Sequence, residues 1–275
     1  MTTRQEWWRR ALAGLAAIGC MAWSSPTAMA EPLPELQPHG QATHLMIDGR
    51  PFLIRGGELG NSSASNLEYL APHWETFQAL HLNTVLAPVY WELVEPQEGR
   101  LDFALIDGLI AQARARDMRL VLLWFGSWKN SMSSYAPAWV KRDTRRFPRA
   151  RSAAGEAQEI LSPFSTENLQ ADRKAFVALM RHLARVDAEA RTVIMVQVEN
   201  EIGMLPDARD HAPAATAAWG EPVPAELIAA VEAAPGSPVH ALWQAAGKRT
   251  SGDWSAVFGT SKAAEEVFMA WSLSL

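Results

Sequence analysis

The sequence contains very little cysteine: Cys20 is the single one among 275 residues, so no disulfide framework is available within the chain. Basic residues are not in excess, with 25 Lys and Arg against 30 Asp and Glu, which argues against a nucleic-acid partner. An HExxH zinc motif and a GxSxG nucleophile elbow are both missing. A dinucleotide fingerprint is missing too, because Arg55 stands where its first glycine belongs. We therefore expect neither a metal nor a cofactor.

Long apolar runs are also missing. Residues 1–30 combine early arginines, a short apolar run over 11–23, and Ala28 and Ala30 around a cleavage point. This pattern predicts a secretory signal peptide, and the run is too short to cross a bilayer. We expect export to the periplasm or the extracellular space, with no transmembrane span after processing. Lipoprotein processing at Cys20 is an alternative, which the residues before it match weakly.

The rest of the chain alternates between strand and helix patterns. A Pro-rich linker is predicted over 31–47, and one domain over 48–275. Apolar runs predict strands, and amphipathic segments predict helices between them. The strands are expected at 51–60, 84–91, 119–128 and 193–198, and the helices at 71–83, 102–116 and 165–190. Such alternation indicates parallel β/α units, as in a (β/α)8 TIM barrel.

Polar and aromatic side chains collect directly after each predicted strand. They are Glu58, then Trp91 and Glu92, then Trp128 and Asn130, and finally Glu199, Asn200 and Glu201. In a (β/α)8 barrel, the residues at the carboxyl ends of the strands build one active site. Carboxylates beside aromatic platforms fit glycoside hydrolysis, in which one carboxylic acid protonates the leaving oxygen and a second carboxylate attacks or activates water.

Three motifs carry a family resemblance: "VQVENEIG", "WELVEPQEGRLDF" and "YAPAWVKRD". Together they resemble the catalytic barrel of the β-galactosidases of glycoside hydrolase family 35, in its bacterial branch. A looser likeness extends to family 42 and the wider clan A. The resemblance covers Asp48 to Met204 and implies a retaining hydrolase of terminal β-galactosides or related β-glycosides. It also implies that Asn200 binds the sugar 2-hydroxyl and that Glu201 is the general acid/base.

The chain departs from the family pattern at two places. Trp91-Glu92 stands where better-known members have Trp-Asn, and Trp128-Lys129-Asn130 stands where they have Ala-Glu-Trp. These departures bear on sugar specificity more than on the class of reaction. We expect Trp91, Glu92 and Asn130 to contact substrate, and Trp128 to stack on a sugar ring.

The remaining carboxylates have open alternatives. Glu199 and Glu201 start about 6.6 Å apart on one strand and point the same way, a poor geometry for a catalytic pair. Glu199 is therefore a hydrogen-bond partner or a hydroxyl ligand, or else a carboxylate paired with Arg or Lys. Glu58 and Glu92 bind sugar hydroxyls, or they are salt-bridged or exposed.

The residues after Glu199 contain no further β-branched run, so the barrel is expected to stop after about four units. In the resembling families the nucleophile lies on the seventh strand, and we expect it to be missing here. The open sheet edge predicts self-association. Two functions remain: a glycosidase acting on an oligosaccharide or glycoside, or a non-catalytic carbohydrate-binding remnant of such an enzyme.

Overall fold

The computed structural model describes residues 33–130 and 132–274. The predicted signal peptide and Cys20 lie outside the described residues. Within the described ranges, no helix has both the length and the apolar character needed to cross a membrane.

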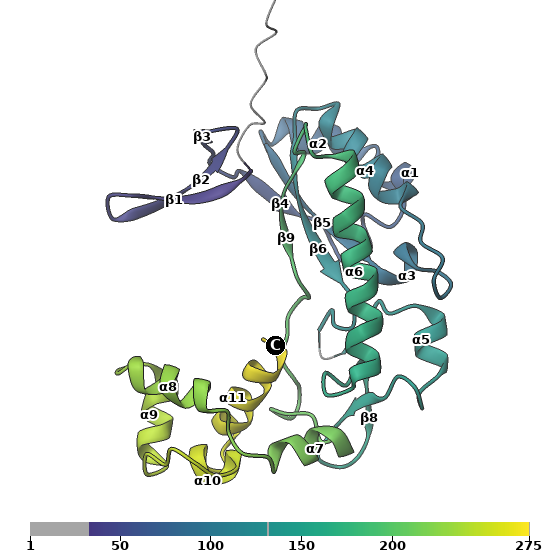
Figure 1. Cartoon of the computed structure of the whole chain (residues 1–275). Helices are drawn as coiled ribbons and strands as arrows, with labels where there is room; N and C mark the ends of the chain where they lie inside the picture. Colours follow the sequence, from purple (N-terminus) through teal and green to yellow (C-terminus); the bar gives the residue numbers. More distant parts are fainter. Residues whose placement is uncertain (1–32, 131, 275) are drawn as a thin grey trace, which may run out of the picture.

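A parallel four-stranded sheet in the order β4-β5-β6-β9 forms the centre of the fold (Figure 1). Its strands are β4 (Gly56–Glu58), β5 (Thr84–Tyr90), β6 (Arg119–Phe125) and β9 (Val193–Gln197). Branched and aromatic residues bury β5 and β6 on both faces, as is usual for inner parallel strands. All four predicted strands are confirmed, although each is shorter than expected, β4 and β6 most of all.

Helices follow the strands and complete the β/α units. They are α1 (Leu67–Leu70), α2 (His73–Ala79), α3 (Trp91–Val94), α4 (Ala104–Arg114), α5 (Ala138–Arg142) and α6 (Thr166–Val186). Ser165 caps α6 by accepting a hydrogen bond from the Asn168 N–H, which explains where this long helix begins. The helix predicted over 71–83 is present as the shorter α2, and the short helix α1 before it was not predicted. The predicted α/β class, part of a (β/α)8 barrel, is confirmed.

The N-terminal lead-in differs from the prediction. Instead of a linker over 31–47, the chain forms an antiparallel sheet of β1 (Glu35–His39), β2 (Ala42–Ile47) and β3 (Arg50–Pro51). Asp48 and Gly49 turn the chain between β2 and β3 with φ angles of 51° and 71°, the conformation that suits an Asp-Gly hairpin turn. The Asp48 carboxylate accepts hydrogen bonds from Arg119 at 2.7 Å and Arg191 at 2.9 Å. These bonds tie the small sheet to the start of the central one.

Helices occupy the chain after β9. They are α7 (Pro213–Trp219), α8 (Ala225–Ala233), α9 (Pro238–Ala245), α10 (Trp254–Phe258) and α11 (Lys262–Leu273). As predicted, the described residues contain no strand after β9. Helix α7 forms where Pro213 begins an alanine-rich segment that favours helix.

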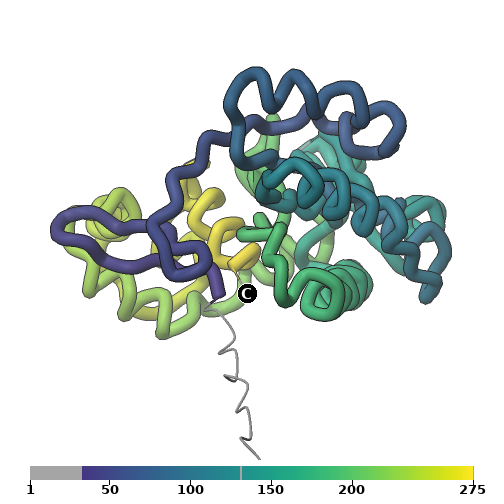
Figure 2. The backbone as a smooth tube through the Cα atoms, turned by 90° about the horizontal axis from the view of Figure 1, so that it is seen from above, coloured from purple at the N-terminus to yellow at the C-terminus, as the bar shows by residue number. Residues whose placement is uncertain are grey.

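These C-terminal helices bury their own hydrophobic cluster. It includes Trp254, Phe258 and Phe268, together with Trp128 from the loop after β6. The hairpin of β7 (Arg149–Arg151) and β8 (Ala157–Leu161) contributes Ala150 and Ile160. Helices α8 to α11 and the β1–β2 hairpin lie on one side of the molecule, and α4 and α6 lie on the other (Figure 1, Figure 2). The region predicted as one partial barrel thus contains two hydrophobic clusters.

Candidate active site

The predicted site residues stand at the carboxyl ends of the four central strands. Because these strands are parallel, their carboxyl ends lie at the same end of the sheet. Hydrogen bonds join two of the ends directly, those of β6 and β9. The structure therefore brings the residues after β6 together with Glu199, Asn200 and Glu201.

Asn200 is held in a fixed orientation. Its side chain is 9% exposed, and its Nδ2 donates to the backbone oxygen of Lys129 at 2.9 Å. Its Oδ1 accepts a hydrogen bond from Gln197 Nε2 at 2.6 Å. A buried amide with both ends bonded keeps one geometry, which is what a ligand-binding side chain needs.

Glu201 faces solvent and pairs with a lysine. Its side chain is 60% exposed, and Lys129 Nζ, itself only 8% exposed, lies 3.0 Å from Glu201 Oε2. The hydrogen bond from Lys129 lowers the pKa of Glu201, and Asn130 acts in the same direction. In this structure Glu201 is thus a carboxylate, whereas the general acid of a glycosidase is protonated when it acts.

Glu199 lies in a different environment two residues earlier. Its Oε2 accepts the Trp128 N–H at 2.9 Å, and its Oε1 accepts the Ser127 N–H at 3.3 Å. Burial raises the pKa of Glu199 well above its ordinary value, with the Asp172 carboxylate contributing in the same direction. Among the described residues no Arg or Lys pairs with this carboxyl, so the structure favours its prediction as a hydrogen-bond partner.

Both predicted tryptophan contacts are contradicted. Trp91 is fully buried, and its Nε1 donates to Glu95 Oε2 at 3.0 Å. Trp128 is 2% exposed, and its Nε1 donates to the Leu161 backbone oxygen at 3.1 Å. Each ring is packed inside a hydrophobic cluster and leaves no open face for a sugar. The stacking role predicted for Trp128 is wrong in this structure, as is substrate contact through Trp91.

The other predicted residues lie at separate positions along this end of the sheet. Glu58 is exposed at the end of β4, and Glu92 forms an ion pair with Lys141 at 3.3 Å. Both are the environments that the sequence left as alternatives to sugar binding. Asn130 Oδ1 accepts from the Met132 N–H and the Ser133 hydroxyl. The roles of these residues in substrate binding stay predictions.

Two residues of this region were not predicted as site residues. Lys129 stands between Trp128 and Asn130 in the polar cluster after the third predicted strand, and that position was the signal that could have found it. Asp172 lies on α6, and a lone aspartate on a helix gives no sign in the sequence that it reaches a strand end. Lys129 belongs to the loop between β6 and α5, and Asp172 accepts a hydrogen bond from Ser127 in that loop.

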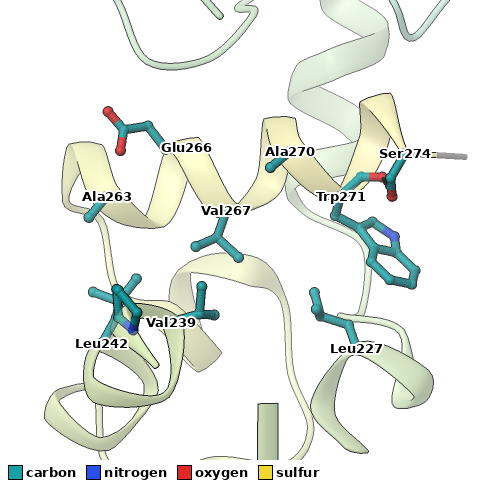
Figure 3. A pocket seen from close by; sticks show the side chains of 10 residues that line it. Leu227, Val239, Leu242, Ala263, Glu266, Val267, Ala270, Trp271 and Ser274 are labelled. Carbon is teal, nitrogen blue, oxygen red and sulfur yellow. Dashed lines mark hydrogen bonds between the residues drawn. The ribbon is translucent and has the colours of Figure 1, made fainter. Parts of the chain in front are cut away.

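An apolar cavity lies away from these strand ends. A cavity of about 470 Å³ opens between α8, α9 and α11, and apolar side chains line it, among them Leu227, Leu242 and Trp271 (Figure 3). None of the predicted site residues lines it. Within the described part of the chain, no group of three or more His, Cys, Asp or Glu is arranged to hold a metal ion.

The fold consists of parallel β/α units with carboxylates at the carboxyl ends of the strands, where (β/α)8 barrels place their active sites. The family Glyco_hydro_42, described as Beta-galactosidase, matches residues 65–227, which is more than half of the chain. The chain belongs to this family. The match supports the β-galactosidase resemblance, but it supports family 42, where the sequence likeness is looser, and not family 35.

Known relatives agree with this assignment. A Beta-galactosidase of Xanthomonas manihotis is 29% identical over 216 residues, which cover 74% of this chain and 32% of the relative. The chain thus spans about a third of that relative's length.

Solved structures give more distant matches. The β-galactosidase of the psychrophilic Marinomonas ef1 has a TM-score of 0.49 and 18% identity, over 70% of this chain and 27% of that structure. The β-galactosidase of Rahnella sp. R3 has a TM-score of 0.47 and 16% identity, over 76% and 28%. At these values the assignment rests on the family match.

Proposed function

We propose that this chain provides the acid/base half of a retaining glycoside hydrolase that acts on terminal β-galactosides or related β-glycosides. The observation that carries the proposal is the pair of neighbours after β9. Asn200 is buried and fixed by two hydrogen bonds, whereas the Glu201 carboxylate beside it is open to solvent. Family membership supports the same reaction class.

The residues would act in sequence. Asn200 would hold the sugar ring by its 2-hydroxyl, and Glu201 would protonate the glycosidic oxygen as the bond to the anomeric carbon breaks. A second carboxylate would take the anomeric carbon as a glycosyl ester. Glu201, now deprotonated, would then remove a proton from the water that hydrolyses this ester.

The second carboxylate is not assigned to a described residue. Glu199 bonds to the loop after β6, and Glu92 is paired with Lys141. We propose that the nucleophile lies in a segment equivalent to the part of the longer relatives that this chain does not span. Activity is accordingly a property of the protein that carries both parts.

The test uses the protein produced from its native gene and an aryl β-D-galactoside with an activated leaving group. Glu201→Ala should lower kcat/KM about 10²–10⁴-fold for a galactoside with a poor leaving group and much less for one with a good leaving group, because only the poor leaving group needs the acid. Azide should rescue the variant by attacking the glycosyl ester in place of water, which gives a β-galactosyl azide.

Glu232→Gln serves as a control, since Glu232 is exposed on α8 and away from the predicted site. It should leave both rates at the wild-type level. An α-configured azide product, or equal losses for Glu201→Ala with good and poor leaving groups, would contradict the acid/base role of Glu201.

We further propose that the protein is exported through residues 1–30 and acts in the periplasm or outside the cell. The basic start, the short apolar run and the Ala28–Ala30 cleavage pattern support this. N-terminal sequencing of the mature protein from the periplasmic fraction should begin at Glu31, and an intact Met1 there would contradict it.

A further inference from the structure

Two carboxyl groups meet beneath the end of β6. Asp172 comes from α6, where it is 7% exposed, and Glu199 comes from the end of β9. The Ser127 N–H donates to both of them, at 2.6 Å to Asp172 Oδ2 and at 3.3 Å to Glu199 Oε1. Because one N–H group contacts both oxygens, Oδ2 and Oε1 lie next to each other.

The space around the Asp172 carboxylate is closed, and Glu199 beside it is partly buried. Trp124 Nε1 donates to Asp172 Oδ1 at 2.8 Å. A Cβ atom on Gly126 would come within 2.6 Å of both Asp172 oxygens and within 2.4 Å of the Trp124 Nε1 atom. Position 126 therefore admits glycine alone, and the chain wraps tightly around the Asp172 carboxylate.

Two carboxylates cannot both stay ionised at this distance. Both Asp172 oxygens already accept N–H donors, and Glu199 Oε2 accepts the Trp128 N–H. Only Glu199 Oε1, with its long 3.3 Å contact, has room for a hydrogen of its own. We propose that Asp172 and Glu199 share one proton, carried by Glu199 Oε1 and donated to Asp172 Oδ2, and that this pair positions the loop after β6 for the site.

Few charges act on the pair. On β6 and its loop the facing groups are uncharged: the Trp124 indole and the N–H groups of Ser127 and Trp128. The Lys129 ammonium in the same loop is directed to Glu201 instead. On α6, the charge that acts on Glu199 is Asp172 itself, and burial and that charge both raise the pKa of Glu199.

The positioning role follows from the chain of contacts. The pair holds the backbone of Ser127 and Trp128, and the next residue, Lys129, bonds to both Asn200 and Glu201. The Glu199 backbone, with a φ of 59°, adopts a conformation that non-glycine residues disfavour, so it needs such anchoring. The shared proton is independent of the proposed function, whereas the positioning role rests on it.

The experiment measures the unfolding equilibrium of the full chain against pH, for the wild type, Glu199→Gln, Asp172→Asn and the control Glu189→Gln. Because the native pair binds a proton that the unfolded chain releases above about pH 4.5, the unfolding constant should rise with pH. The rise is up to about tenfold per pH unit until the raised pKa is reached. Glu189 is exposed between α6 and β9, so its variant should follow the wild type.

Glu199→Gln should flatten this rise, because its amide N–H permanently replaces the shared proton. Asp172→Asn should raise the unfolding constant about tenfold or more at neutral pH, since its amide N–H₂ must face the Ser127 or Trp124 donor. Unchanged pH dependence in Glu199→Gln, or its failure to fold, would overturn the shared proton. If Glu199→Gln and Asp172→Asn changed the unfolding constant equally at neutral pH, the assignment of the shared proton to Glu199 would be overturned. If Asp172→Asn does not fold, the pH dependence of the unfolding constant in the wild type and in Glu199→Gln still decides whether the proton is shared.

The positioning role is read from kcat of the native-gene protein with an aryl β-D-galactoside. The loss of kcat at rising pH should be shallower in Glu199→Gln than in the wild type, because the variant cannot lose the shared proton. Parallel pH profiles would overturn the positioning role. A wild type without glycosidase activity at any pH would overturn the proposed function, while the unfolding result for the proton would stand.

Discussion

Lys129 sets the charge of the predicted acid/base residue. Its ammonium is buried while Glu201 is exposed, so the pair is screened on one side and its energy is modest. Its effect on protonation is nevertheless directional: Lys129 lowers the pKa of Glu201 and opposes the protonated form that the first step needs. Binding of substrate between the two groups would remove this opposition.

This gives a prediction for Lys129→Met. Without the ammonium, the pKa of Glu201 should rise, so the acid stays protonated to higher pH. The alkaline limb of the kcat/KM profile should therefore move to higher pH than in the wild type. Arg is the matched control, because Lys129→Arg keeps the charge and should keep the limb in place. A limb that stays put in Lys129→Met would mean that Lys129 does not act on Glu201 in the working enzyme.

Single residues also show where sequence reasoning stops. Asn200 and Glu201 could be predicted as site residues, because polar side chains directly after a buried strand must face a pocket or a partner. The contact between Glu199 and Asp172 could not be predicted, because Asp172 lies far away in the sequence, on a helix. The burial of Trp128 had the same cause: the cluster that covers it is built from helices after β9. Side chains whose environment comes from distant segments cannot be placed by local pattern.

At the scale of elements, the prediction succeeded where burial is strong. Strands β5 and β6 and helix α6 carry dense apolar patterns, and each lies close to its predicted range. The β1–β2 hairpin was missed because β1 is exposed along its whole length and shows no apolar alternation. The Asp48-Gly49 pair between β2 and β3 is a local sign of a hairpin turn there.

Asp210 fastens the β7–β8 hairpin to the C-terminal helices. This fully buried carboxylate accepts the Arg151 N–H at 2.9 Å and the Ala212 N–H at 2.7 Å on Oδ1, and the Ser162 hydroxyl at 2.6 Å on Oδ2. Removing it would leave three donors without an acceptor in a closed space. The hairpin and α7 are therefore expected to lose their connection together.

We predict that Asp210→Ala lowers the free energy of unfolding by about 3 kcal/mol or more, at about 1–3 kcal/mol for each unsatisfied buried group. Asp210→Asn should lose far less. Its Oδ1 keeps both N–H donors, and its amide N–H₂ can donate to the Ser162 hydroxyl. Urea unfolding of both variants checks this. Equal losses for Ala and Asn would show that the charge of Asp210, rather than its hydrogen-bonding geometry, stabilises the connection.

On the scale of the whole molecule, the four-stranded sheet ends in an open edge. β9 pairs with β6 on one side only, and the other side meets no strand among the described residues. Met195 on β9 is 44% exposed, and Val198 just after it is 64% exposed. A parallel sheet normally has both faces and both edges covered, so this edge presents unpaired N–H and C=O groups beside apolar side chains.

We predict that the isolated chain self-associates through this edge, and that Met195→Lys combined with Val198→Lys suppresses the association by placing charge beside it. Sedimentation velocity over a wide range of concentrations measures both. Leu80→Lys is the control, because Leu80 is equally exposed at the end of α2 but does not border the open edge. If the wild type stays monomeric throughout, or if Leu80→Lys disperses it as well as the double variant does, the edge is not the contact. The apolar side chains around β9 would then be tolerated as ordinary surface.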